Sequence, residues 1–550
     1  MSDNRTGHAP GITGRLTRRR LLGSTAAAAA AGIASASFRW FAEHGPAYGA
    51  AQRALRILQS EPVFGFNPVL ESTNWPETNR MVYNGLTDLS PAGQFVPGVA
   101  SVWTVNDRGD TFTFKLLPGI KFTDGKELTS EDVKFTYELL VDPKVGSTLG
   151  SFVTNLKGVD TPDKYTAVLR FDGPNVLMMP LVSPMGILPA HLWAGSDPRT
   201  NKYLRAPVGS GPFIVTEWQH GDHISFERNP NYFRKPKPYV DQVFFRIAPD
   251  ASTGLLAFLN HDLDVVLSQG IPGGPPYDQM RKVLDAKLTG VVATEFEQNW
   301  VQNLFVNTSK PPFNNVKVRQ ALAHAIDKAF IIKSLLFGFG KPEETLVPDT
   351  PATKWAHASN VRPYDHSVEK ANALLEEAGL PRKGGTRFPV TILATEGFRV
   401  KLSEALREML RTVGIAAEIK TYTYGEYIGR IRQQDTAACV WTLFISKQMD
   451  PAAICEYVNG KNAKPGGTNF SAWDNPQVTE WIPQARATTD RAKRAPLYIK
   501  IQEVVHQEVP VIPLYTANGI DLWYSRITGM HSVDSLTGTM ESVENARITA

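Results

Sequence analysis

Several short stretches of the chain alternate apolar and polar side chains. Thr111–Leu116 and His223–Glu227 follow this pattern, and a period of two is typical of a strand with one buried face. Other stretches repeat apolar residues at intervals of three and four, which is the period of an amphipathic helix. We therefore expect short strands and longer helices in one chain.

The clearest helical stripe runs from Leu402 to Val413, where Gly414 ends it. Further stripes cover residues 318–330 and 368–378. A strand is expected directly after Gly414, so that residues 401–422 form helix, turn and strand, which is half of an α/β crossover. Strands dominate the first half of the chain and helices the segment from about 300 to 510. This distribution predicts an α/β fold with two unequal lobes.

Composition indicates a folded body with little net charge. The chain has 550 residues, of which 42% are apolar and 10% aromatic, and its formal charge is +4. Residues 1–50 contain six Arg and only two acidic residues, so this segment accounts for the whole surplus. A neutral remainder has no general field that would attract a polyanion, and we expect no nucleic-acid partner.

The first 50 residues have the order of an export signal. Arg18, Arg19 and Arg20 precede two leucines and a stretch of Ala, Gly and Ser over residues 23–38. The arginine pair with a weakly apolar core resembles a twin-arginine signal, which predicts export to the periplasm in the folded state. The alternative is an N-terminal membrane anchor, against which the scarcity of large aliphatic side chains argues. Cleavage after Ala36 and cleavage after Gly49 both fit the sequence.

The sequence contains none of the short motifs that mark common catalytic or metal sites. It lacks HExxH, GxSxG, a phosphate-binding GK[ST] loop and a DxDxDG loop, so we expect no catalysis, no cofactor and no bound metal. Cys439 and Cys455 are the only cysteines. Outside the cytoplasm they would form either a disulfide or two buried thiols.

Residues 114–133 contain the turns Pro118-Gly119 and Asp124-Gly125 and a predicted helix cap at Thr129. This is the most specific of a series of segments that follow one another in a recognisable order. The other segments are residues 66–68, 83–87, 99–103, 209–213, 228–232, 312–321, 325–328, 374–380, 450–451, 469–476 and 510–514. In this order the series resembles the extracytoplasmic solute-binding proteins of peptide-type ABC importers, the dipeptide/oligopeptide/nickel-binding family 5.

The resemblance implies a two-lobed periplasmic-binding-protein clamp of type II, from the large cluster with an extra subdomain, which closes on its ligand about a hinge. The first lobe is discontinuous and would comprise residues 51–265 and 518–550, with the extra subdomain at 93–204. The second lobe would comprise residues 266–517.

The resemblance also implies the ligand-binding residues. In peptide-binding members an Asp of an Asp-Pro element binds the α-ammonium of the ligand, and the matching residue is Asp450 before Pro451. The preceding link, residues 443–449, is longer and more apolar than we expect for the family. The alternative role of Asp450 is to cap a helix that starts near Pro451.

Six further residues, at three places in the chain, are candidates for contact with the ligand. Trp441 would pack on the ligand or in the core. Ser72, Thr73, Asn74 and Trp75 follow the opening strand, where family members form one wall of the pocket, and a turn is the alternative for them. Arg399 is the nearest candidate for the family's carboxylate clamp, and a solvated helix start is its alternative.

The function implied is binding of a peptide or peptide-like solute by a monomer that delivers it to the transmembrane subunits of an ABC permease. A second possibility is the same fold with another cargo, such as an opine, a metal chelate or an oligosaccharide. A third is a periplasmic hydrolase, which would need a nucleophile and an oriented base that the sequence does not reveal.

Overall fold

The structure, a computed structural model, describes residues 53–59, 63–70, 76–90, 94–147, 150, 153, 155–179, 183–248, 250–267, 274–350, 353–395, 397–444, 450–531 and 538–549. The predicted export signal at residues 1–50 therefore lies outside the described residues.

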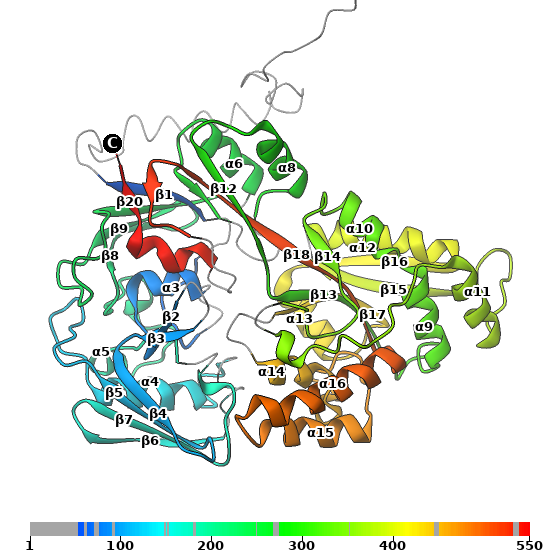
Figure 1. The fold of residues 1–550 in the computed structure, drawn as a ribbon, viewed down its shortest axis with the longest axis horizontal. Coiled ribbons are helices and arrows are strands. Elements are labelled where there is room, and N and C mark those ends of the chain that lie inside the picture. Colours follow the sequence, from blue (N-terminus) through cyan, green and yellow to red (C-terminus); the bar gives the residue numbers. More distant parts are fainter. Residues whose placement is uncertain are drawn as a thin grey trace, which may run out of the picture.

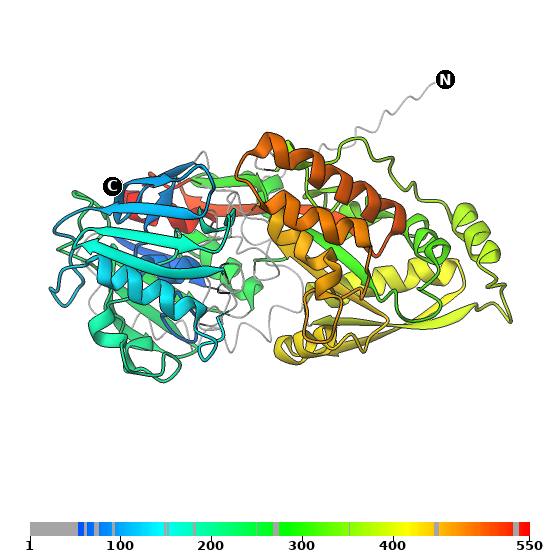
Figure 2. The same ribbon diagram turned by 90° about the horizontal axis from the view of Figure 1, so that it is seen from below.

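The chain forms two α/β lobes, which lie side by side in both views (Figure 1 and Figure 2). One sheet of 12 strands runs through both lobes in the order β16-β15-β17-β13-β18-β11-β1-β10-β9-β8, with β12 and β14 paired to β18. The predicted two-lobed α/β fold is confirmed.

The first lobe contains the opening strand and the end of the chain. Its strands are β1 (Ala54–Gln59), β2 (Thr87–Leu89), β3 (Phe95–Pro97), β8 (Phe213–Gln219), β9 (His223–Arg228), β10 (Gln242–Ile247), β11 (Val265–Val266), β12 (Val291–Glu297), β19 (Ile527–Thr528) and β20 (Arg547–Ile548). Its helices are α3 (Pro76–Val82), α6 (Ala251–Leu259), α8 (Tyr277–Ala286) and the 3₁₀ helix η8 (Gly538–Asn545).

A four-stranded antiparallel sheet with the order β4-β5-β7-β6 lies below the first lobe in Figure 1. Its elements are β4 (Ala100–Val105), β5 (Thr111–Leu116), α4 (Ser130–Val141), β6 (Leu156–Asp163), β7 (Thr166–Phe171), α5 (Ala190–Trp193) and η4 (Lys202–Leu204). The predicted cap is present, since Thr129 N donates to Asp132 Oδ2 over 2.9 Å at the start of α4. We call this part, which falls within the range predicted for the extra subdomain, the subdomain.

The second lobe carries most of the long helices. Its strands are β13 (Trp300–Val306), β14 (Gly340–Pro342), β15 (Phe388–Thr395), β16 (Ile415–Tyr422) and β17 (Ala438–Phe444). Its helices are α9 (Val316–Ala325), α10 (Lys328–Ser334), α11 (Val368–Glu377), α12 (Phe398–Thr412), α13 (Tyr424–Arg432), α14 (Pro451–Cys455), α15 (Pro476–Arg486) and α16 (Arg491–Glu508), with the 3₁₀ turns η5 (Lys354–Ala356), η6 (Glu456–Val458) and η7 (Gly460–Asn462).

The long strand β18 (Val511–Tyr524) joins the two lobes. Its first half pairs with β13, and its second half pairs with β12. Because β12 and β13 follow each other closely in the chain, two neighbouring connections cross between the lobes here (Figure 1). Rotation at this crossing would move one lobe relative to the other, so we call it the hinge.

Buried apolar side chains form one large cluster in the first lobe and two in the second. The domain boundaries predicted from the sequence stay a prediction, with two observations against the cut between residues 265 and 266. Met280 and Val283 of α8 belong to the first lobe's cluster, and β12 pairs with the first-lobe half of β18.

Candidate functional site

Aromatic and charged side chains gather where α12 begins, next to the hinge. The ring of Tyr277 on α8 lies edge-on to Phe398, with 6.2 Å between ring centroids, and its hydroxyl donates to the Asn518 carbonyl over 3.3 Å. Tyr277 packs against the clusters of both lobes. Its position therefore ties α8, the start of α12 and β18 together.

Arg399 lies in this group and is only 4% exposed. Its Nη1 donates to Thr395 Oγ1 over 2.9 Å, from the first turn of α12 to the end of β15. Burial raises the pKa of the nearby Tyr515 well above its ordinary value, Tyr277 adds to this rise, and the positive charge of Arg399 opposes it. The alternative of a solvated helix start is wrong for Arg399, and its contact with a ligand stays a prediction.

Asp450 caps α14, as the sequence suggested. Its Oδ1 accepts from Ala452 N over 3.0 Å, and the residue is 8% exposed. Its Oδ2 also accepts from Arg494 Nη1 over 2.6 Å, and Tyr498 Oη donates to its Oδ1 over 3.2 Å. Both carboxylate oxygens are thus engaged within the protein.

The partner of Asp450 was not predicted. Burial alone would lower the pKa of Arg494, but Asp450 and Tyr498 outweigh burial and raise it. Arg494 lies 44 residues away on α16, and no local pattern indicates so distant a pairing. A ligand ammonium at Asp450 would have to share the carboxylate with this guanidinium.

The remaining predicted contacts are placed only in part. The backbone of Trp441 lies in β17 opposite Asn303 of β13, while its side chain is outside the described part of the structure. Ser72, Thr73, Asn74 and Trp75 lie outside the described residues. Whether these five residues contact a ligand stays a prediction.

The cysteines are two free thiols buried in the same cluster of the second lobe. Burial raises the pKa of Cys439 to about 12. Of the two alternatives, the structure has the buried thiols, and such cysteines behave as small apolar side chains.

Beside the hinge lies a buried carboxyl that the sequence analysis did not single out. Glu343 follows β14 and is 3% exposed, and its Oε1 accepts from Thr516 Oγ1 on β18 over 2.8 Å. Burial raises the pKa of Glu343 to about 7, and Asp349 adds to this effect, while Thr516, Lys341 and Lys328 oppose it. Its surroundings thus favour the neutral acid over the carboxylate, so that both forms are populated near pH 7.

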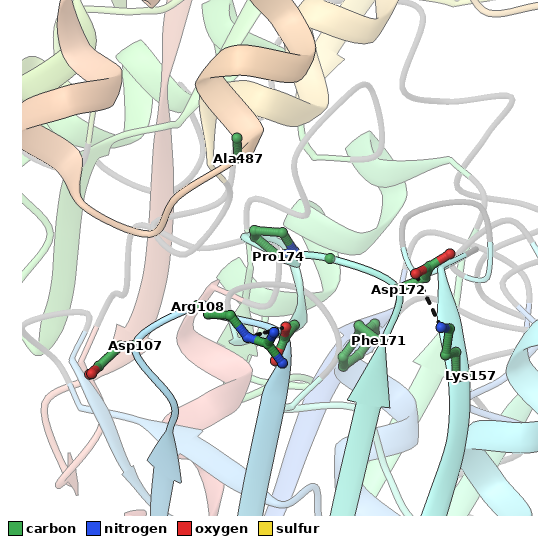
Figure 3. Close-up of a pocket in the computed structure, with 9 residues that line it drawn as sticks. Asp107, Arg108, Lys157, Phe171, Asp172, Pro174 and Ala487 are labelled. Carbon is green, nitrogen blue, oxygen red and sulfur yellow. Dashed lines mark ion pairs between the residues drawn. The ribbon is translucent and has the colours of Figure 1, made fainter.

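A crevice of about 560 Å³ lies where the subdomain meets the second lobe, at the turn between α15 and α16. Figure 3 shows Pro174 of the subdomain below the turn that carries Ala487. Four charged side chains of the crevice form two ion pairs, Arg108 with Asp110 over 3.0 Å and Lys157 with Asp172 over 3.2 Å. We call this contact region the seam.

Among the described residues, no cluster of three or more His, Cys, Asp or Glu could hold a metal ion. Within the same part of the chain, no helix has the length and apolar character needed to cross a bilayer.

Comparisons of the sequence with a family profile and with known proteins match this chain to solute-binding proteins. The sequence profile of the bacterial extracellular solute-binding proteins, family 5 Middle, matches residues 94–465. The dipeptide-binding protein of Escherichia coli (strain K12) is 29% identical over 481 residues, which cover 82% of this chain and 86% of that protein.

Two solved structures share the fold. NikA from Brucella suis, in complex with Fe(III)-EDTA, matches with a TM-score of 0.80 at 22% identity over 90% of this chain and 100% of that one. AgaA from A. tumefaciens R10, in complex with agropinic acid, matches with a TM-score of 0.77 at 25% identity over 90% and 99% of the two chains. These neighbours hold chemically different solutes in one fold.

Proposed function

Because the chain belongs to family 5 of the bacterial extracellular solute-binding proteins, we propose that it binds a peptide or peptide-like solute between its lobes and delivers it to an ABC permease. The observation that carries the peptide class is the match to the dipeptide-binding protein over more than four fifths of both chains. The hinge at β12, β13 and β18 supports closure of the lobes on the solute.

The proposed action is binding and release without a chemical step. When the lobes close around a solute, hydrogen-bonding groups of both lobes replace the water around it. Because the solute binds the closed state more tightly than the open state, it shifts the equilibrium toward closure. We propose that the protein works as a monomer in the periplasm, reached by the twin-arginine route through the signal in residues 1–50.

A second candidate is an opine-like solute, which combines carboxylates with amine or amide groups. The match to the complex with agropinic acid supports it, and a buried cation at Arg399 suits an anionic group. Peptides and opines share a carboxylate and differ in the free α-amino group, so the amine distinguishes them.

Isothermal titration calorimetry tests the proposal with trialanine, N-acetyl-trialanine, agropinic acid and a nickel–histidine complex. We expect trialanine to bind with micromolar or tighter affinity and the acetylated peptide to bind more weakly, because the ammonium loses its hydration on closure and needs a partner. Binding of agropinic acid alone would support the opine. Binding of the nickel complex alone, or of none of the four compounds, would contradict both candidates.

A further inference from the structure

The segment that leaves β7 buries neighbouring side chains in the cores of different lobes. Val176 and Leu177 belong to a cluster of the second lobe, with 8% and 0% exposure. Met178 is also fully buried, but it belongs to the cluster of the first lobe and the subdomain. Two apolar side chains of the subdomain are therefore inserted into the other lobe.

This segment is fixed to the subdomain by its backbone and by side-chain amides. Asn175 N donates to the Gly109 carbonyl over 2.9 Å, and Asn175 Nδ2 donates to Asn155 Oδ1 over 2.8 Å. Leu177 N in turn donates to Asn175 Oδ1 over 3.0 Å. Val176 and Leu177 must therefore move with the subdomain when the lobes rotate.

The seam makes a second contact beside these side chains. A Cβ placed on Gly109 would lie 2.9 Å from Thr489 Cγ2 at the turn between α15 and α16. Even the methyl group of an alanine at residue 109 would thus be too close to Thr489, where the subdomain contacts the second lobe. Glycine at residue 109, which has φ +70°, suits both the turn and the contact.

The seam and the hinge lie at opposite sides of the molecule. In Figure 1 the crossing of β12 and β18 is in the upper part, while the subdomain and α15 face each other in the lower part. A rotation at the hinge that opens the lobes would separate the seam. Val176 and Leu177 would then lose their contacts in the second lobe and meet water.

We propose that Val176 and Leu177 form a latch that holds the two lobes closed independently of the solute. Exposing a buried leucine is unfavourable, so the latch shifts the open–closed equilibrium toward the closed state by about tenfold or more. The proposal goes beyond the proposed function, because it concerns the solute-free protein and does not depend on which solute binds.

Small-angle scattering tests the latch on protein stripped of solute by unfolding and refolding. Leu177→Ala, and the milder Val176→Ala, should increase the radius of gyration relative to the wild type. Met178→Ala is the matched control, since it truncates the next buried side chain within the first lobe's cluster. It should keep the wild-type radius although it also lowers the melting temperature.

Thermal unfolding of each variant shows that the compared samples are folded. A wild-type radius of gyration for both Leu177→Ala and Val176→Ala would overturn the latch, as would an equal increase in Met178→Ala. If Leu177→Ala does not fold, Val176→Ala alone decides. Because no solute is present, failure of the latch is distinct from failure of the peptide-binding proposal, which calorimetry measures.

Discussion

At the scale of single residues, Asp450 has a structural role that is separable from its expected ligand role. It neutralises the buried Arg494 and caps α14. Asparagine can still cap a helix, but it leaves the guanidinium of Arg494 without a counter-charge. Removing one partner of a buried ion pair typically lowers the free energy of unfolding by about 3–5 kcal/mol. We therefore expect Asp450→Asn to lower the melting temperature in calorimetric scans.

The ligand role of Asp450 has its own readout. If Asp450 also binds the ligand ammonium, as the family resemblance implies, Asp450→Asn should weaken binding of a free-amine peptide by about thirtyfold or more and leave the N-acetylated peptide unaffected. Affinities within about threefold of the wild type for both peptides would show that Asp450 serves only the fold.

Glu343 should make stability depend on pH. Its pKa of about 7 lies above the ordinary value of 4.5, so between these values the folded protein binds more protons than the unfolded chain. Protonated Glu343 therefore adds to the free energy of unfolding. This contribution is fully present below pH 4.5 and is lost as the pH rises through 7, and its size is on the order of 3 kcal/mol.

We expect Glu343→Gln to flatten the fall in unfolding free energy between pH 5 and 8, measured by urea denaturation. Glutamine keeps an acceptor for Thr516 and carries no charge at any pH. The control is Glu480→Gln on the exposed face of α15, which should follow the wild-type profile. A wild-type slope in Glu343→Gln would show that Glu343 does not titrate in this range.

Residue roles were predictable from the sequence only where they are local. The caps at Thr129 and Asp450 depend on neighbouring backbone groups, which a sequence motif reveals. The pairing of Asp450 with Arg494 and the burial of Arg399 depend on the packing of distant elements. Their chemistry could not be read from residue type and spacing.

At the scale of elements, alternation predicted β5 and β9, and helical periodicity predicted α11 and α12. The helix, Gly turn and strand predicted over 401–422 are α12 and β16, with Gly414 at φ +81° between them. The single helix predicted over 318–330 is wrong, because the structure has α9 and α10. Asp327 Oδ1 accepts from Phe330 N and starts the second helix, so a cap interrupts an otherwise continuous apolar stripe.

Replacing a glycine by alanine should lower the stability of the protein in one element and raise it in another. Gly519 of β18 pairs with Phe296 of β12, and an added Cβ would lie 2.4 Å from the ring at Cζ. Gly519→Ala should therefore destabilise the protein by about 1–3 kcal/mol. Gly429 lies inside α13 with open space around an added Cβ, so Gly429→Ala should stabilise it by about 0.5–1 kcal/mol.

Thermal unfolding of both variants measures these effects. A melting temperature for Gly519→Ala equal to that of the wild type would show that the ring of Phe296 moves aside without cost. Such a result would argue against close packing of β12 on β18 at the hinge.

At the scale of the whole molecule, the two-lobed α/β architecture was predictable from the sequence, but the pairing of strands between the lobes was not. The 14 residues of β18 pair with strands of both lobes. Alternation along one strand reveals which face is buried and not which strand lies beside it. The latch was hidden for the same reason, since Leu177 and Met178 are both apolar in the sequence and differ only in the lobe that buries them.

Export is a prediction about the whole chain. Replacing Arg18, Arg19 and Arg20 with Lys keeps the positive charge and removes the arginine pair that the twin-arginine route recognises. We expect the precursor to accumulate in the cytoplasm, as measured by cell fractionation and immunoblotting. Periplasmic accumulation equal to that of the wild type would contradict the twin-arginine route.

The most direct test of the account is native mass spectrometry of the protein isolated from the periplasm of its host. A clamp that closes on its cargo should retain a fraction of it, and collisional release of that cargo gives its mass and fragments. We predict a peptide or a peptide-like molecule with a free amine. A metal chelate or an oligosaccharide as the retained molecule would contradict the account.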